Sequence, residues 1–202
     1  MPADWSVAQR VLHWATAVLV VGGFAIAFVM VALPLNALLL KFTLYQVHKS
    51  IGLLVLLLVL ARLALRIGRG RPVPEPMPRW QLYAASLGHG VLYALLLVVP
   101  VLGYCVASTA SLRIPTRFLG LITLPDPIGR DPTLFAILRP LHQTLAIILI
   151  VLAAGHAAMA VLHHLRGRMV LRQMWFGGRR VPSPLSGGGE GQGEVGDAPL
   201  RR

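Results

Sequence analysis

Residues 141–165 read LHQTLAIILIVLAAGHAAMAVLHHL, an apolar run without a carboxylate, and the first two of its four histidines are His142 and His156. As a helix, this run is long enough to cross the hydrocarbon core of a membrane. The two histidines are fourteen residues apart, which places them about 40° apart around a helix axis and about 21 Å apart along it. Because an imidazole inside lipid is costly and usually functional, the run predicts two histidine centres at two membrane depths.

The composition of the whole chain is that of an integral membrane protein. Of its 202 residues, 56% are hydrophobic and 13% are charged, whereas a soluble domain has roughly a quarter charged residues. Four apolar runs reach the length of a membrane span. We therefore predict an all-α fold, a transmembrane four-helix bundle. The expected helices cover about residues 11–33, 44–67, 82–107 and 141–165.

The connection between the third and fourth runs is long and mixed in character. Residues 108–139 contain four prolines and two short apolar pieces, 118–124 and 134–138. This pattern is typical of short interfacial helices that lie on the membrane. Pro140 suits the first turn of the fourth helix.

The composition changes again at the end of the chain. Gly, Ser, Pro and Glu dominate residues 177–202, and a segment with few apolar residues cannot bury enough surface to fold. We therefore expect a transmembrane domain over residues 1–176 and a disordered cytoplasmic tail over residues 177–202.

Basic residues predict the orientation of the helices, because cytoplasmic loops carry an excess of Arg and Lys. With both termini on one side, that side holds thirteen basic residues and the other holds six. We therefore predict cytoplasmic termini and a long periplasmic loop between the third and fourth helices. The net charge of +12 is then topogenic, and no nucleic acid partner is expected, since a lipid-embedded bundle has no broad basic face. The thirteen are Arg10, Arg62, Arg66, Arg69, Arg71, Arg79, Arg166, Arg168, Arg172, Arg179, Arg180, Arg201 and Arg202, and the six are Lys41, Lys49, Arg113, Arg117, Arg130 and Arg139.

This topology places four histidines at two matching depths. His48 and His142 fall on the periplasmic side, and His13 and His156 fall toward the cytoplasm. Each pair takes one imidazole from each of two helices, which is the arrangement that bis-imidazole ligation of a b-type haem requires. A single intramembrane histidine is often only a hydrogen-bonded structural residue, and zinc also takes histidine ligands. Zinc sites usually gather more ligands at one level, so the four residues favour haem.

Three further histidines have more than one possible role. His89, flanked by two glycines, is an alternative to His13 or His156 as a ligand, or it packs at the edge of the haem. His163 follows His156 by two helical turns and therefore lies on the same face. It is placed to contact a substrate at the edge of the inner haem, or else it forms an interfacial pair with His164.

Other residues near the histidines suit the periphery of a haem. Arg62 lies fourteen residues after His48, on the haem-facing side at the inner depth, where a haem propionate would be a bidentate acceptor. The alternative is that Arg62 extends to the cytoplasmic surface. Arg10 and Lys49 are weaker propionate candidates. Gly52 lies one turn after His48 and would let a macrocycle approach the backbone.

Five motifs follow one another along the chain: QRVLHW (9–14), VHKSIG (47–52) leading to Ala61-Arg62-Leu63, LGHGVLY (87–93), LHQTLA (141–146) and GHAA (155–158). Together they resemble the bacterial cytochrome b561 family of the inner membrane, over about residues 5–176. The resemblance implies two haem b groups, held by His13, His48, His142 and His156, and electron exchange with the ubiquinone pool of the respiratory chain. It also implies that His163 lines a quinone site.

The resemblance and the charge pattern together give an expected function. We expect a superoxide oxidase, an oxidoreductase that moves electrons from periplasmic superoxide to ubiquinone, with a net positive periplasmic side that steers the anion. The alternative within the family is a cytochrome b membrane-anchor subunit of a hydrogenase or another dehydrogenase, with a redox protein bound to residues 108–139. A histidine-lined metal transporter without haem is a third possibility, from a different class.

Overall fold

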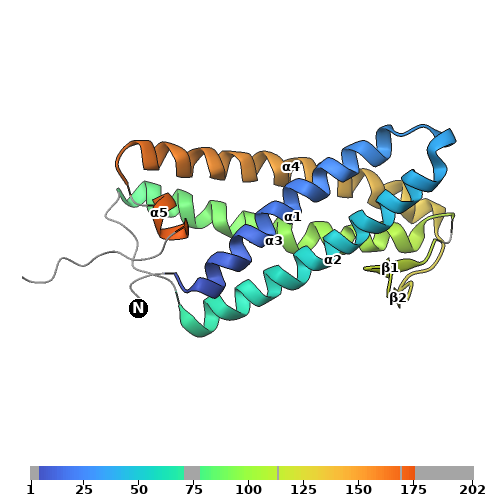
Figure 1. Ribbon diagram of the computed structural model, residues 1–202, viewed down its shortest axis with the longest axis horizontal. Helices are drawn as coiled ribbons and strands as arrows, with labels where there is room; N and C mark the ends of the chain where they lie inside the picture. Colours follow the sequence, from blue (N-terminus) through green and yellow to red (C-terminus); the bar gives the residue numbers. More distant parts are fainter. Residues whose placement is uncertain (1–4, 71–77, 113, 169, 176–202) are drawn as a thin grey trace, which may run out of the picture.

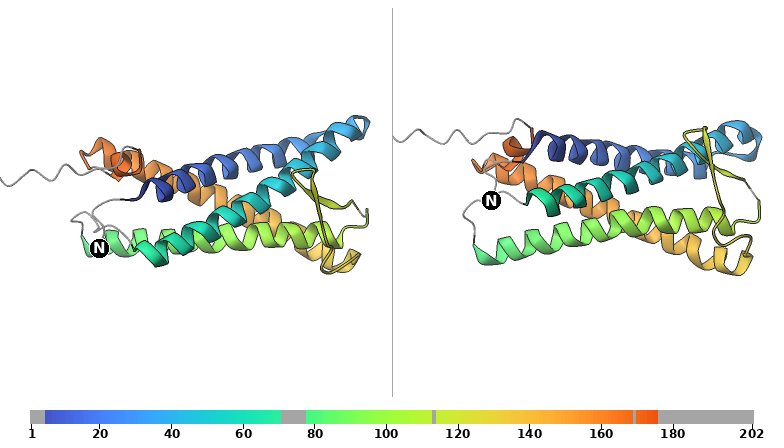
Figure 2. Two further views of the ribbon diagram at one scale, coloured as in Figure 1. Left: turned by 60° about the horizontal axis from the view of Figure 1, so that its bottom comes forward. Right: turned by 90° about the horizontal axis from the view of Figure 1, so that it is seen from below.

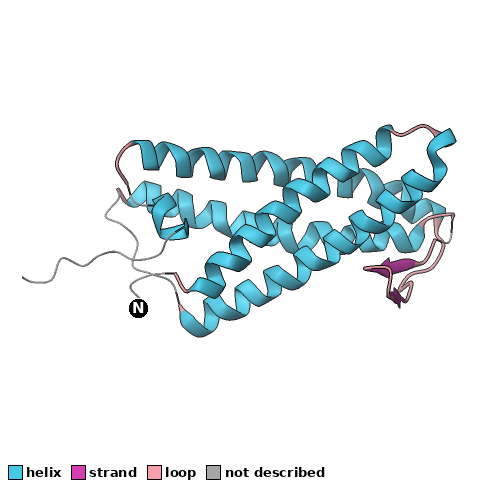
Figure 3. Cartoon of the chain, in the orientation of Figure 1, coloured by secondary structure: helices cyan, strands magenta, loops and turns pink. Residues whose placement is uncertain are grey.

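The computed structural model describes residues 5–70, 78–112, 114–168 and 170–175, and it contains four long helices and one hairpin (Figures 1 and 3). A 3-10 turn, η1, joins α1 to α2, and the hairpin of β1 and β2 lies between α3 and α4. The short helix α5 follows α4. The bounds are α1 Val7–Ala32, η1 Leu35–Ala37, α2 Leu38–Arg69, α3 Arg79–Thr109, β1 Thr116–Phe118, β2 Ile122–Leu124, α4 Pro132–Leu165 and α5 Val170–Trp175.

All four long helices are apolar and long enough to cross a membrane, with a mean hydropathy between 2.3 and 2.6 over their most apolar windows. Large apolar side chains point outward along them, for example Phe28, which is 74% exposed. Such a surface suits contact with lipid, because a soluble protein that exposed so many apolar side chains to water would aggregate. The prediction of a mostly helical, multi-pass membrane protein with four spanning helices is confirmed. The predicted tail, residues 177–202, lies outside the described residues, as do Arg71 and Arg113.

The bundle has two different ends (Figures 1 and 2). α1 begins at one end, where α5 also lies, and we call this the terminal end. The hairpin and the turn between α1 and α2 lie at the opposite end, which we call the hairpin end. The four helices alternate in direction, so α4 runs from the hairpin end back to the terminal end.

A small apolar core joins three of the helices. Val55 and Val59 of α2 pack with Leu96 and Val99 of α3 and with Leu149 of α4. The helix α1 also approaches α2 closely, because a Cβ atom on Gly23 would lie only 3.0 Å from Cγ2 of Ile51. Small residues at a helix crossing allow such close contact in membranes, where van der Waals packing drives association.

The connection between α3 and α4 differs from the prediction. Residues 118–124 form the hairpin rather than an interfacial helix, and residues 134–138 belong to α4, which begins at Pro132 instead of near residue 141. Asp131 explains the earlier start, since its side chain accepts a hydrogen bond from the backbone N–H of Leu134 at 2.9 Å and Pro132 fits the first turn. Pro140, predicted at a first turn, therefore lies inside the helix. Membrane helices tolerate this where neighbours satisfy the freed backbone.

Two side chains of α2 fasten the hairpin to the bundle. Ser50, which is buried, donates to the carbonyl of Arg117 at 3.2 Å and accepts from the N–H of Leu119 at 3.0 Å. Gln46, one turn earlier, donates to the carbonyl of Pro115 at 2.8 Å and accepts from the N–H of Arg117 at 3.2 Å. Both backbone groups of Arg117 are therefore bound to α2, and β1 has a fixed position on the hairpin end.

Replacing Ser50 with alanine tests this attachment. Ser50→Ala leaves the carbonyl of Arg117 and the N–H of Leu119 without their partner, so we expect a loss of about 1–3 kcal/mol in the free energy of unfolding. Hydrogen exchange at the Leu119 amide should also accelerate. Thr43→Ala is the matched control, because Thr43 is exposed on the same helix and bonds only to the carbonyl of Leu39. Equal exchange rates at Leu119 in the wild type and in Ser50→Ala would contradict the attachment.

Candidate functional site

The structure brings the four histidines together as two pairs. His48 of α2 faces His142 of α4 toward the hairpin end, with 6.4 Å between their ring centroids. His13 of α1 faces His156 of α4 toward the terminal end, with 6.3 Å between the centroids. We call these the hairpin-end pair and the terminal-end pair. These are the two pairs that helix spacing and topology predicted.

The separation within each pair fits one metal ion bound between two imidazoles. An imidazole nitrogen binds a first-row metal at about 2.0 Å, and the ring centre lies about 1.1 Å behind that nitrogen, as bond lengths near 1.33 Å require. Two rings on opposite sides of one ion are therefore about 6.2 Å apart. Both pairs match this value. The rings of His89 and His156 are 5.2 Å apart, which is too close for that arrangement, so the geometry favours His13 over His89 as the partner of His156.

In the hairpin-end pair, backbone carbonyls determine which ring nitrogen of each histidine carries the proton. Nδ1 of His48 donates to the carbonyl of Gly23 at 3.0 Å, and Nδ1 of His142 donates to the carbonyl of Val99 at 3.1 Å. A carbonyl only accepts, so each neutral ring carries its proton on Nδ1 and leaves Nε2 as a lone-pair donor. Ligating histidines in metalloproteins are oriented in this way. The Nε2 atoms of this pair could therefore hold the iron of a haem.

Glycines leave room around the same pair. A Cβ atom on Gly103 would lie 2.9 Å from Cε1 of His142, so this ring occupies the space that a side chain would need. A Cβ atom on Gly52, one turn after His48, would meet nothing within 4 Å. The open side of Gly52 fits the predicted approach of a macrocycle to α2. The sequence did not single out the contact between Gly103 and His142.

The terminal-end pair has cationic neighbours. Nη2 of Arg62 lies 3.1 Å from Nδ1 of His13, and the guanidinium groups of Arg62 and Arg66 lie 5.3 and 5.4 Å from the centre of the Tyr93 ring. None of the helices α1 to α4 contains a carboxylate. The two half-buried arginines thus have no acidic partner within these helices and suit an anionic group of a ligand. Arg62 lies at the predicted depth, and its role with a propionate stays a prediction.

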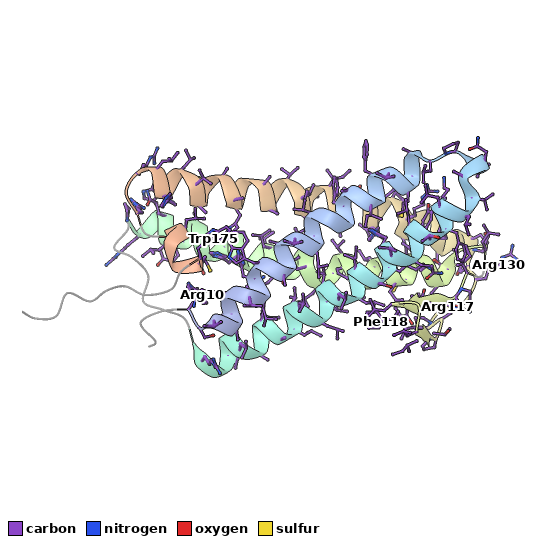
Figure 4. The ribbon with its side chains drawn as sticks, in the orientation of Figure 1. Arg10, Arg117, Phe118, Arg130 and Trp175 are labelled. Atoms are coloured by element: carbon purple, nitrogen blue, oxygen red, sulfur yellow. The ribbon has the colours of Figure 1, made fainter. Side chains whose placement is uncertain are left out.

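The weaker propionate candidates are bound to backbone. Arg10 donates to the carbonyl of Trp175 at 3.3 Å, next to Trp14, whose indole N–H donates to Met174 at 3.1 Å. Lys49 donates to the carbonyl of Ile114 at 3.3 Å. Figure 4 shows Arg10 and Trp175 together at the terminal end. Both cations therefore tie α5 or the connection before the hairpin to the bundle.

His163 lies near the end of α4 with two polar neighbours. Nη1 of Arg168 is 3.4 Å from Nδ1 of His163 and 3.1 Å from Oε1 of Gln81, at the start of α3. His163 is half-buried, whereas His164 is exposed, which agrees with a solvated role for His164. The sequence did not identify Gln81 or Arg168, and the available signal was Gly167, a residue type that commonly ends a helix.

No group of three or more His, Cys, Asp and Glu side chains able to hold a metal ion occurs among the residues that the structure describes. The histidines gather in pairs instead. Two histidines would suffice to hold a haem, because the macrocycle itself supplies the other ligands of the iron.

Comparison with known proteins gives one consistent result. The chain matches the family described as prokaryotic cytochrome b561 over residues 4–177. It is 31% identical to "Cytochrome b561 homolog 2" of Escherichia coli (strain K12) over 174 residues, which cover 81% of this chain and 86% of the relative. It is 33% identical to "Cytochrome b561 homolog 1" of the same organism, over 59% of this chain and 66% of the relative. It is 30% identical to "Probable superoxide oxidase CybB" of Yersinia pestis, over 64% of this chain and 73% of the relative.

A methyl group at Gly103 tests the space around His142. In Gly103→Ala, the new Cβ would lie 2.9 Å from the ring, so the imidazole must shift from the position in which its Nδ1 bonds to Val99. We expect a loss of about 1–3 kcal/mol in stability and a lower haem content per purified chain, measured from the pyridine haemochrome spectrum. Gly68→Ala is the control, since a Cβ there meets nothing within 4 Å. Full haem content in Gly103→Ala would show that the ring position does not matter.

Proposed function

The chain belongs to the prokaryotic cytochrome b561 family, whose members bind haem b and transfer electrons in membranes, and from this premise we propose that it is a di-haem superoxide:ubiquinone oxidoreductase. One haem b would bind at each histidine pair, within a transmembrane domain over residues 1–176. The observation that carries the proposal is the spacing of the two pairs, 6.3 and 6.4 Å between ring centroids. Bound haem b supplies reversible one-electron chemistry at its iron.

The chain's own residues divide into ligands and supporting groups. His48 and His142 would hold one haem and His13 and His156 the other, and the open side of Gly52 would leave room for a macrocycle. Arg62, with Arg66 beside it, would hold a propionate at the terminal-end pair, since no carboxylate of the helices competes for it. Positive charge stabilises an added electron, so these arginines favour electron flow toward the terminal end.

The orientation follows from basic residues at the two ends. We place the terminal end in the cytoplasm of a bacterial cell, with the protein in the inner membrane and the hairpin end in the periplasm. The described basic residues that support this are, at the terminal end, Arg10, Arg62, Arg66, Arg69, Arg79, Arg166, Arg168 and Arg172 and, at the hairpin end, Lys41, Lys49, Arg117, Arg130 and Arg139. The predicted bias becomes larger with the arginines outside the described residues.

The hairpin end suits a small anionic donor. Arg117 and Arg130 are labelled at this end in Figure 4, the side chain of Arg117 is exposed, and its backbone is fixed by Gln46 and Ser50. The described carboxylates there are Asp126 and Asp131, so the net charge is positive and would speed the encounter with superoxide. The name of the Yersinia pestis relative supports this choice of donor.

The terminal end suits the acceptor. Two superoxide anions each lose one electron and become O2, and one ubiquinone takes up both electrons and two protons to become ubiquinol. His163 would be the catalytic residue that contacts the quinone, with Arg168 and Gln81 as polar neighbours. It lies two turns beyond His156 along α4, close to the cytoplasmic water that supplies the protons.

Histidine substitutions test the number and place of the haems. Because each pair would hold one haem, His142→Ala and His13→Ala should each lower the haem content from about two to about one per chain, with a different component of the reduced spectrum lost in each case. His164→Ala, an exposed histidine on the same helix as His142, is the control and should keep both. Unchanged haem content in either pair variant would overturn the assignment.

The activity itself is tested with purified protein. We expect ubiquinone to be reduced and superoxide decay to accelerate above its spontaneous rate, measured by stopped flow or pulse radiolysis. His163→Ala should slow ubiquinone reduction at least about tenfold while the haem spectrum stays intact. No acceleration by the wild type would reject the superoxide reaction. Stable co-purification of a dehydrogenase subunit would then favour the membrane-anchor function.

A further inference from the structure

The end of α4 returns the chain onto His163. Gly167 has a φ of +78°, in the left-handed region that glycine adopts without strain. Its N–H donates to the carbonyl of His164 at 3.0 Å, and the N–H of Arg168 donates to the carbonyl of His163 at 3.0 Å. These two bonds form a Schellman motif, which places Arg168 beside the residue five positions before it.

A second helix holds the Arg168 side chain in place. Nη1 of Arg168 donates to Oε1 of Gln81 at 3.1 Å, and the same nitrogen is 3.4 Å from Nδ1 of His163. Nη1 carries two hydrogens, so it can serve both acceptors at once. The guanidinium is thus fixed from one side by the turn at Gly167 and from the other by the first turn of α3.

The chemistry of arginine decides which nitrogen of His163 carries the proton. A guanidinium donates hydrogen bonds and never accepts them, so Nδ1 of His163 must be the acceptor. A neutral imidazole with an unprotonated Nδ1 has its proton on Nε2. The side chain of His163 then offers a ligand the N–H of Nε2 as a donor, and it offers no acceptor, because Nδ1 already accepts from Arg168.

We propose that Arg168 is a positioning residue that holds His163 as an Nε2–H donor for a carbonyl oxygen of the quinone. This inference rests on the proposed quinone site. A quinone has carbonyl oxygens that only accept, whereas a quinol has hydroxyl groups that can donate. The arrangement therefore favours binding of the oxidised form, which is the form that must enter the site.

The decisive measurement is the tautomer of His163. In nitrogen-15 NMR of histidine-labelled protein, the signals of His163 are those absent from His163→Gln. We expect an unprotonated Nδ1 and a protonated Nε2 in the wild type, a mixture of tautomers in Arg168→Leu, and recovery of the first pattern in Arg168→Lys, which restores a donor. Arg166→Gln is the matched control, since Arg166 is exposed two residues away and its loss removes the same charge.

Steady-state kinetics give the second measurement. Loss of one hydrogen bond to the quinone should raise its KM about three- to tenfold in Arg168→Leu, with haem content unchanged and with little effect in Arg166→Gln. Gly167→Ala, which strains the turn at φ +78°, should change KM in the same direction. This variant provides the test if Arg168→Leu does not fold.

The outcomes separate the two proposals. A wild-type protein that does not reduce ubiquinone would end the proposed function, and the tautomer would still be readable. A protonated Nδ1 in the wild type, or the same tautomer in the wild type and in Arg168→Leu, would overturn the role of Arg168 even if quinone turnover is normal. An equal rise in KM in Arg166→Gln would assign the effect to net charge instead of to His163.

Discussion

The structure depends on one constraint, which is that the ring nitrogens of a histidine inside an apolar bundle must have hydrogen-bond or metal partners. At the hairpin-end pair this is achieved without any additional polar side chain. Val99 and Gly23 use carbonyls that belong to helix backbone, and a carbonyl oxygen has a second lone pair after its helical hydrogen bond is made. His142 and His48 thus gain a fixed orientation, while the surrounding helices keep the apolar composition that lipid requires.

The two histidine pairs differ in the charge of the groups that surround them. At the hairpin end the partners are neutral dipoles, and they keep the charge of the site low. At the terminal end Nη2 of Arg62 lies near Nδ1 of His13, and the guanidinium groups of Arg62 and Arg66 both lie by the Tyr93 ring. Because a guanidinium only donates, Arg62 would have to turn from Nδ1 to the propionate for Nε2 of His13 to bind iron. A cation in a membrane is costly unless an anion accompanies it. The absence of carboxylates in α1 to α4 therefore makes the terminal-end pair the natural place for a ligand that brings negative charge of its own.

The sequence predicted what depends on periodicity and missed what depends on distant contacts. Apolar length gave the four helices, and the fourteen-residue spacing of His142 and His156 led to both pairs, because helical rise and phase are nearly invariant. The hairpin was missed, since its attachment to Ser50 joins residues 67 and 69 positions apart. Arg168 was missed for the same reason, as Gln81 lies 87 positions away. The start of α4 has a local cause, the cap at Asp131 followed by Pro132, and the sequence prediction of a first turn at Pro140 did not include it.

The attachment of the hairpin also bears on the orientation of a histidine. Gln46 and Ser50 are four residues apart on α2, so they share one face of the helix, whereas His48 lies between them and about 200° around the axis from Gln46. The face of α2 that carries Gln46 and Ser50 is bound to β1, and the opposite face therefore presents the imidazole of His48 to α4. Rotation of α2 about its axis would break the bonds to Arg117 and Leu119 as it moved His48 away from His142. The hairpin therefore does more than cover one end of the bundle, because it fixes the rotation of the helix that carries one of the two paired rings.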